Sequence, residues 1–226
     1  GWIMLLALVA TPFLGALLPL LFARAGRLWP AWLAGATTVV GLLLLAALWG
    51  RVFAGEVIVE RWQWLPQAGL ELALRMDGLG LLFTTLILGI GLLVVLYARY
   101  YLPADRPLGR FYTLLLVFMG AMLGVVLSEN LLVLLVFWEL TSLSSFFLIS
   151  YHHDDYHARR SARMALTVTG AGGLALLGGI LLLGEMAGSY DLSTVLAAGD
   201  AIRAHDLYLP ALILVLLGVF TKSAQF

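Results

Sequence analysis

Seven apolar stretches of bilayer length constrain the fold of this 226-residue chain more than any other feature. A helix needs about 17–25 mainly apolar residues to cross about 30 Å of hydrocarbon. Aromatic residues such as Trp29, Trp49 and Tyr151 flank these stretches, as expected at membrane interfaces. The stretches are Trp2–Phe22, Ala31–Trp49, Gly78–Ala98, Phe111–Leu127, Leu131–Ser150, Met164–Gly184 and Leu207–Phe226.

Composition excludes a soluble globular protein. The chain is 62% hydrophobic and 12% charged, whereas a globular domain carries about 25% charged residues. Its 13 basic and 13 acidic residues balance, so no overall charge favours nucleic acid as a partner. Without cysteine, disulfides and thiolate metal sites are excluded, and no cofactor motif is found. We therefore predict an all-α, polytopic bundle of seven membrane helices in a lipid bilayer, with no cofactor and no metal.

The two ends of the sequence differ in character. Gly1–Ile3 is apolar and has no charged segment or cleavage site, which favours a first membrane helix over a signal peptide. The last residue, Phe226, lies inside an apolar run without a polar flank. We expect residues 1–226 to be the N-terminal part of a longer transmembrane domain, truncated within the seventh span.

Arginines in the connections predict the orientation. The odd-numbered connections carry most of them, while the fourth has none and the sixth is mainly acidic. The positive-inside rule then places the N-terminus outside and the odd connections in the cytoplasm. The arginines of the odd connections are Arg24, Arg27, Arg99, Arg106, Arg110, Arg159, Arg160 and Arg163.

Several shorter patterns predict local structure. Val57–Leu65 and Leu70–Leu74 alternate around the turn Pro66–Gly69, which favours a small external β-hairpin. In the sixth stretch, Ala171, Ala175 and Gly179 recur every four residues and favour close helix packing. Three further patterns are weaker: Asp77 as an N-cap, Glu129–Asn130 as a capped turn, and His152–His157, which we interpret as a solvated loop and not a metal site.

Glu139 and Lys222 are charged residues inside membrane spans, and Lys222 is the only lysine. An acid or a lysine in mid-span costs about 2.5–3.5 kcal/mol on insertion scales and usually marks an ion path. Counting from the helix starts places the two residues about 10 Å apart in depth. A long lysine side chain shortens this gap, so whether the two residues touch is an open question. Proton carriage and a fixed ion pair between helices are both open. Candidate polar or water-lining residues are Thr141, Ser142, Ser144, Ser145, Thr221 and Ser223, although serine and threonine hydroxyls commonly bond their own helix.

Four segments resemble the antiporter-like subunits shared by Mrp antiporters, respiratory complex I and membrane-bound hydrogenases. The resemblance runs from about Arg75 to the last residue and implies that Glu139 and Lys222 are the ionisable residues of a proton channel. It also implies a helix broken after the lysine and a second, inverted five-helix unit. The segments are Arg75–Phe83, Ser128–Leu132, Phe137–Phe146 and Thr221–Phe226.

Within this group, Trp138–Ser142 looks most like the large, A-type subunit of Mrp-type multisubunit Na+/H+ antiporters. Complex I subunits more often have glycines after the glutamate, and the large one has a charged pair in helix six, whereas Thr167–Leu183 has no charge. The resemblance implies a non-enzymatic transporter subunit in a bacterial plasma membrane, with other subunits as partners and Na+ and H+ as transported ions. A proton-pumping subunit of a redox complex and a structural scaffold remain alternatives.

Overall fold

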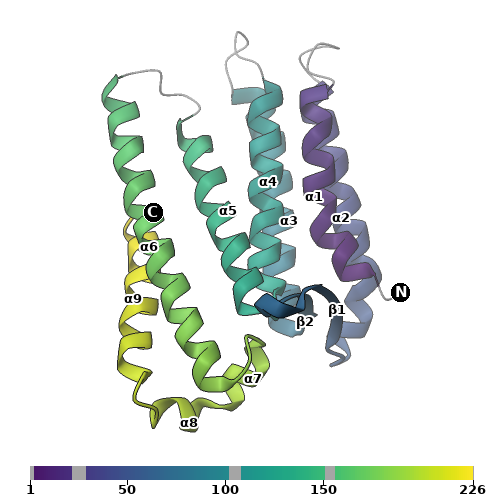
Figure 1. Ribbon diagram of the computed structural model, residues 1–226. Helices are drawn as coiled ribbons and strands as arrows, with labels where there is room; N and C mark the ends of the chain where they lie inside the picture. The colour runs from purple at the N-terminus through teal and green to yellow at the C-terminus, as the bar shows by residue number, and fades with distance from the viewer. Residues whose placement is uncertain (1–2, 22–28, 102–107, 151–155, 226) are drawn as a thin grey trace. The chain divides into compact units, whose positions relative to one another are not determined.

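The computed structural model describes residues 3–21, 29–101, 108–150 and 156–225, and these form two compact, mainly helical units (Figure 1). The first unit comprises Gly1–Glu60 and Leu74–Leu127, and the second comprises Arg61–Ala73 and Ser128–Phe226. The division between the units runs through a small β-hairpin, so each unit includes part of it.

The first unit packs four membrane-length helices: α1 (Met4–Leu21), α2 (Trp29–Phe53), α3 (Gly78–Tyr101) and α4 (Leu108–Leu127). Helix α1 contacts both α2 and α4, and α3 packs beside α2 and α4. Two side-chain hydroxyls join helices, because Thr113 donates to the Ala16 carbonyl at 2.6 Å and Tyr112 donates to the Val95 carbonyl at 3.2 Å. The fully buried side chains of this unit include Leu5, Leu8, Leu48, Leu88, Leu116 and Met119.

The beginning of α1 is capped by a buried carboxylate from the hairpin. Glu60, only 5% exposed, accepts hydrogen bonds from the backbone N–H groups of Leu5 at 2.7 Å and Leu6 at 3.1 Å. The first N–H groups of a helix have no partner within the helix and attract negative charge. This contact accounts for the burial of an acidic side chain in the first unit.

The predicted β-hairpin is confirmed. Strand β1 (Ile58–Leu65) pairs with β2 (Leu70–Met76) in a two-stranded sheet, and a single 3₁₀ turn, η2 (Pro66–Ala68), connects them. Gly69 follows the turn with a φ of +73°, a conformation that glycine adopts without strain. The alternation of β-branched and aromatic residues that predicted the strands therefore reflects real pairing.

The second unit contains three long helices and two short ones: α5 (Leu131–Ser150), α6 (Tyr156–Ala187), α7 (Leu192–Ala197), α8 (Gly199–Arg203) and α9 (Tyr208–Gln225). Helix α9 lies along the C-terminal part of α6, and α6 also packs against α5 (Figure 1). The hydrophobic core of this unit contains Leu131, Leu135, Leu176, Ile180, Val195 and Ile202.

Small residues allow α6 and α9 to approach closely, as the sequence predicted. A Cβ at Gly179 would lie 3.0 Å from the Val215 backbone nitrogen, and one at Gly172 would lie 2.7 Å from the Thr221 Cβ. Neither distance leaves room for a methyl group. The glycines are therefore required by the packing of this helix pair.

Helix ends are where the structure differs most from the expected spans. Helix α6 begins at Tyr156, before the predicted start at Met164, because arginine-containing sequence supports helix beyond the apolar region. The two capping predictions are confirmed. Asp77 accepts from the Gly80 N–H at 2.8 Å at the start of α3, and Asn130 accepts from the N–H groups of Leu132 and Val133 at the start of α5.

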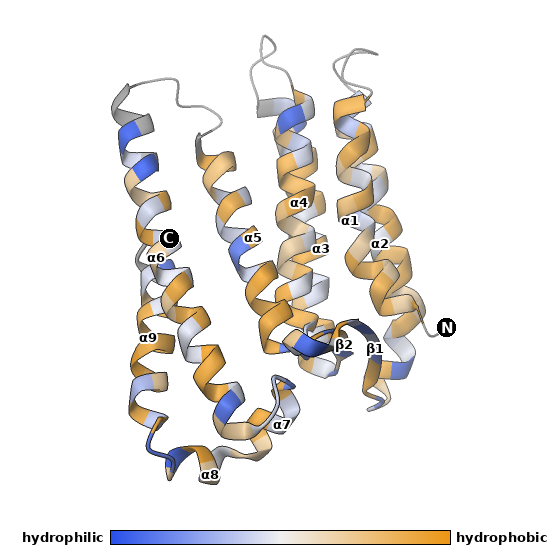
Figure 2. Cartoon of the chain, viewed as in Figure 1, coloured by the Kyte–Doolittle hydropathy of each residue, from blue (hydrophilic) through white to orange (hydrophobic). Residues whose placement is uncertain are grey.

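Six described helices are long and apolar enough to cross a membrane, and the apolar part of α9, Tyr208–Lys222, is shorter. Figure 2 shows these helices as mainly hydrophobic, with hydrophilic residues mostly near helix ends, in the hairpin and around α8. Large apolar side chains lie exposed on their surfaces, for example Leu43 at 65% and Leu93 at 65%. Such extensive apolar exposure is typical of a membrane protein and is rare on soluble proteins.

Candidate functional site

Helices α5 and α9 of the second unit bring the predicted charged residues close together. The Lys222 ammonium donates to the Trp138 carbonyl at 3.1 Å and to the Thr141 hydroxyl, and it lies 4.2 Å from the centroid of the Trp138 ring. The carbonyl, the hydroxyl and the face of an indole ring all attract a cation. One turn of α5 therefore binds the only lysine of the chain.

The lysine reaches the turn of α5 that carries Glu139, although counting along the helices placed the two residues about 10 Å apart in depth. The simple count is wrong because it assumes that both helices begin at the same level. In Figure 1 the start of α9 lies below the start of α5, on the side of α8, so a residue farther along α9 reaches the level of Glu139.

Glu139 has a different environment from Lys222. Its side chain is half-buried, and its Oε1 atom is fully buried without a hydrogen-bond donor among the residues that the structure describes. Among these described residues, no ion pair joins Glu139 to Lys222, although the two groups are close enough to interact electrostatically. The arrangement is therefore two neighbouring charges held by different surroundings, not a closed salt bridge.

The hydroxyls near Glu139 are turned mainly toward their own helix. Thr141 donates to the Trp138 carbonyl at 2.6 Å while its oxygen accepts from Lys222, so it belongs to the site. Ser142 also reaches the Trp138 carbonyl, at 3.3 Å, and Ser144 donates to the Leu140 carbonyl at 2.7 Å. Both serines are buried.

Two further candidate polar residues, Thr221 and Ser145, make no hydrogen bond to Lys222 in the described structure. Thr221 donates to the Leu217 carbonyl at 2.6 Å, which is the common helical alternative. Ser145 is half-buried on α5, and the side chain of Ser223 lies outside the described part of the structure. Thr141 is thus the predicted polar residue that joins Lys222 directly.

Two residues of the site were not singled out from the sequence. Trp138 supplies both a carbonyl and a ring to Lys222. Gly173 of α6 faces the Glu139 carboxyl group, where an added Cβ would collide with it. Trp138 is next to Glu139 in the chain, and Gly173 belongs to the run of small residues. Their roles depend on which helix faces meet, which neither signal reveals.

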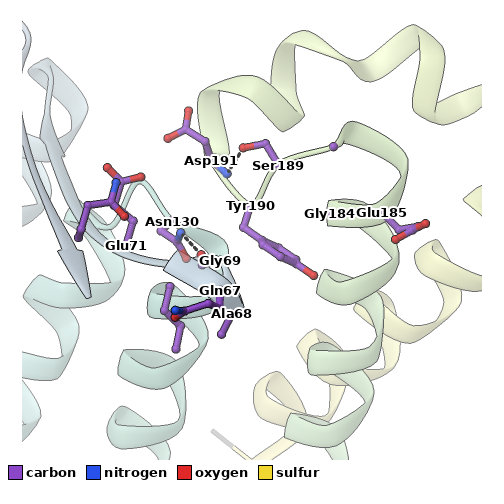
Figure 3. A pocket seen from close by; sticks show the side chains of 13 residues that line it. Gln67, Ala68, Gly69, Glu71, Asn130, Gly184, Glu185, Ser189, Tyr190 and Asp191 are labelled. Atoms are coloured by element: carbon purple, nitrogen blue, oxygen red, sulfur yellow. Dashed lines mark hydrogen bonds between the residues drawn. The ribbon is translucent and has the colours of Figure 1, made fainter. Parts of the chain in front are cut away.

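A polar pocket of about 590 Å³ lies elsewhere in the second unit, beside the hairpin turn (Figure 3). Asn130 donates to the Gly69 carbonyl at 2.9 Å and Ser189 accepts from the Asp191 N–H at 3.0 Å, so these contacts fix the loops around it. The lining residues are Gln63, Gln67, Ala68, Gly69, Leu70, Glu71, Asn130, Gly184, Glu185, Gly188, Ser189, Tyr190 and Asp191.

Ionic contacts tie the hairpin to the loop before α7. Arg61 pairs with Asp191 at 2.9 Å and with Glu71 at 3.5 Å, and the hydrogen bond to Asp191 raises the pKa of the Arg61 guanidinium above its ordinary value. Glu129, only 2% exposed, accepts from the Ser193 N–H at 3.1 Å and from its hydroxyl. These acidic side chains have structural partners.

The prediction that His152–His157 is a solvated loop is not tested, because His152, His153, Asp154 and Asp155 lie outside the described residues. Over the described ranges, no group of three or more histidine or acidic side chains is arranged to hold a metal ion. The Glu139–Lys222 region, where a carboxyl group and an ammonium lie close together, is the candidate site.

The fold is that of a polytopic membrane protein, and its candidate site holds a half-buried carboxyl group beside a bound lysine. The family model described as "NADH:quinone oxidoreductase/Mrp antiporter, TM" matches residues 128–226. A second, described as "NADH-Ubiquinone oxidoreductase (complex I), chain 5 N-terminus", matches residues 64–112. The chain belongs to this family of antiporter-like membrane subunits.

Curated relatives with similar sequences are antiporter subunits by name. A probable K(+)/H(+) antiporter A/B subunit of Rhizobium meliloti is 53% identical over 96% of this chain. The Na(+)/H(+) antiporter A subunit of Alkalihalophilus pseudofirmus is 44% identical and the A1 subunit of a Staphylococcus aureus Na(+)/H(+) antiporter is 42% identical, each over 96% of the chain. The chain spans 22% of the first relative and 27% of each of the other two.

Solved structures show the same fold. The Mrp complex from Dietzia sp. DQ12-45-1b contains a chain with a TM-score of 0.82 and 34% identity, matched over 96% of this chain and 23% of that one. The archaeal membrane-bound sulfane sulfur reductase matches with a TM-score of 0.76 over 95% of this chain and 33% of its own, but at 22% identity it supports the fold alone.

Proposed function

We propose that this chain belongs to the proton-translocating subunit of a multisubunit Na+/H+ antiporter, with Glu139 and Lys222 in the proton path. The observation that carries the proposal is the way Lys222 is bound. Its ammonium lies among helices on Trp138 and Thr141, beside a Glu139 carboxyl whose buried Oε1 has no donor in the described structure. Charges kept in membrane spans at this cost usually serve ion movement.

The geometry supports a simple proton step. A proton leaves the Glu139 carboxylic acid and is accepted by the Lys222 amine, which leaves a carboxylate and an ammonium. The reverse step returns both groups to their neutral forms. Because no ion pair joins them in the described residues, transfer requires a bridging water or a movement of the Glu139 side chain. A closed salt bridge would hold the proton on the lysine and would serve as a structural anchor.

The choice of antiporter over a redox complex rests on the relatives. Those at 42–53% identity are named as subunits of cation/proton antiporters. The stretch Thr167–Leu183 also has no charged pair, consistent with this choice. The relative with 53% identity is named for K+, whereas the others are named for Na+. We propose Na+ as the exchanged ion, and proton exchange driven by K+ is the comparison that checks this assignment.

The same relatives support the setting of the protein. We propose that it acts as part of a secondary transporter, not as an enzyme, in a bacterial plasma membrane and among other subunits of the complex. The arginine distribution supports an N-terminus on the outside. Nucleic acid has no role in this proposal.

The test measures Na+-driven proton exchange in vesicles that contain the assembled full-length complex. Glu139→Gln keeps the size of the side chain but removes its ionisable proton, and Lys222→Ala removes the amine. We expect each to abolish exchange while the amount of assembled complex stays normal. Ser145→Ala, farther along α5 and outside the contact network, is the matched control and retains exchange. Near-normal exchange in either charge variant would refute the proton-path role, and exchange driven only by K+ would change the proposed ion.

A further inference from the structure

Gly173 of α6 lies directly against the Glu139 carboxyl group of α5. A Cβ added to Gly173 would lie 2.6 Å from the Glu139 Cδ and 2.8 Å from its Oε2, and closer still to Oε1. Real Cβ atoms essentially never approach other heavy atoms within 3.0 Å. The carboxyl group therefore occupies space that exists because residue 173 has no side chain.

Other glycines of α6 have different neighbours. Gly179 packs against the α9 backbone, with the Val215 nitrogen 3.0 Å and the Ala211 oxygen 3.2 Å from its added Cβ. Gly170 has nothing within 4 Å of such an atom. The three nearest atoms at Gly173 all belong to Glu139, so its role differs from the packing role of Gly179.

The Glu139 carboxyl group lies beside Gly173 because the missing side chain leaves space for it, and its buried Oε1 atom receives no hydrogen bond there from any described residue. A group held by several hydrogen bonds resists displacement, whereas one held by an unfilled space moves when that space is filled. A methyl group at position 173 would turn the flexible Glu139 side chain away without disturbing the helix backbones.

We propose that Gly173 is a positioning residue for Glu139, keeping its carboxyl group in reach of the lysine that Trp138 and Thr141 bind. The inference rests on the proposed function, in which Glu139 exchanges protons with Lys222. A displacement of about 1 Å can slow a reaction about 100-fold when geometry is critical. One methyl group at position 173 is thus expected to impair proton transfer while the protein remains folded.

The experiment compares alanine substitutions along α6 in the full-length, assembled complex. We expect Gly173→Ala to assemble normally and to lower Na+-driven proton exchange by about tenfold or more. Gly170→Ala, at the open position on the same helix, leaves exchange unchanged. Gly179→Ala lowers the amount of assembled complex, and the exchange rate per assembled complex stays near that of the wild type.

A double variant separates positioning from packing. Aspartate is one methylene shorter than glutamate, so Glu139→Asp withdraws the carboxyl group from α6 and relieves the collision. We expect Gly173→Ala with Glu139→Asp to exchange protons several-fold faster than Gly173→Ala alone, although Glu139→Asp alone slows the wild type. If Gly173→Ala assembles poorly, recovery of the exchange rate per assembled complex in the double variant supports the same conclusion.

Two results would overturn the positioning role. One is wild-type exchange by Gly173→Ala, and the other is a double variant whose exchange per assembled complex is no faster than that of Gly173→Ala. The Glu139→Gln variant, measured in parallel, separates these failures from failure of the proposed function. If Glu139→Gln is inactive and Gly173→Ala is normal, only the role of Gly173 is wrong. If Glu139→Gln is active, the proton path itself is wrong.

Discussion

At the scale of single residues, Lys222 is bound by one turn of α5 instead of by a carboxylate. A charged lysine in mid-span costs about 2.5–3.5 kcal/mol on insertion scales. The Trp138 carbonyl, the Thr141 hydroxyl and the Trp138 ring offset part of this cost. A cation near an aromatic face gains about 2 kcal/mol when it is desolvated. Helix α5 therefore stabilises the ammonium of Lys222 without an ion pair between Lys222 and Glu139 in the described part of the chain.

Substitution of Trp138 tests this arrangement. We expect Trp138→Leu to slow Na+-driven proton exchange about fivefold to thirtyfold, because losing about 1–2 kcal/mol of cation binding changes an equilibrium by that factor. Trp138→Phe keeps an aromatic face and the backbone carbonyl, so its loss should be smaller. Vesicle exchange, normalised to assembled complex, provides the measurement. Equal rates for the leucine and phenylalanine variants would show that the ring does not contribute.

The sequence predicts Glu139 and Lys222 because a charge inside an apolar stretch is visible without a structure. It does not predict Gly173, whose role depends on the face that α6 turns toward α5. Thr141 and Ser144 have the same sequence signature, yet only Thr141 receives the Lys222 ammonium. Contacts between helices far apart in sequence decide these roles, and periodicity alone does not specify them.

At the scale of elements, apolar length and alternation predict the long helices and the hairpin. The sequence does not predict α7 and α8, which are short and lie in a polar connection. It also does not predict the capping of α1 by Glu60, because Leu5 lies 55 residues away in the chain. Local signals identified the caps Asp77 and Asn130, since each bonds within its own helix start.

The cap on α1 gives a prediction about stability. Glu60→Ala leaves the Leu5 and Leu6 N–H groups without the carboxylate, and an unsatisfied buried group costs about 1–3 kcal/mol. We expect a clear decrease in the melting temperature of the purified complex. Glu56→Ala is the control, because Glu56 is exposed and pairs with Arg51 at the surface. An unchanged melting temperature for Glu60→Ala would show that the cap adds little.

At the scale of the whole molecule, six described helices have the length and hydropathy of membrane spans, and α9 adds a shorter apolar helix. The arginine distribution predicts that the two ends of α6 face opposite sides of the membrane. Ser161 lies near its first end, and Ala197 lies in the connection after its second end. Both residues are exposed.

Cysteine labelling in vesicles tests this topology, and the chain contributes no cysteine of its own. In a cysteine-free background of the full-length protein, we expect an impermeant reagent applied outside to label Ala197→Cys but not Ser161→Cys. A permeant reagent should label both, which controls for reactivity. Outside labelling of Ser161→Cys together with protection of Ala197→Cys would reverse the predicted orientation.

The central claim, that Lys222 gains and loses a proton during transport, is tested most directly by Lys222→Arg. Arginine keeps the positive charge and still donates to a carbonyl or hydroxyl, but its guanidinium is effectively never deprotonated in proteins. The measurement is Na+-driven proton flux in vesicles, normalised to assembled complex. Flux should be lost in Lys222→Arg although the complex assembles. Flux at the wild-type rate would contradict the claim and would make Lys222 a structural cation.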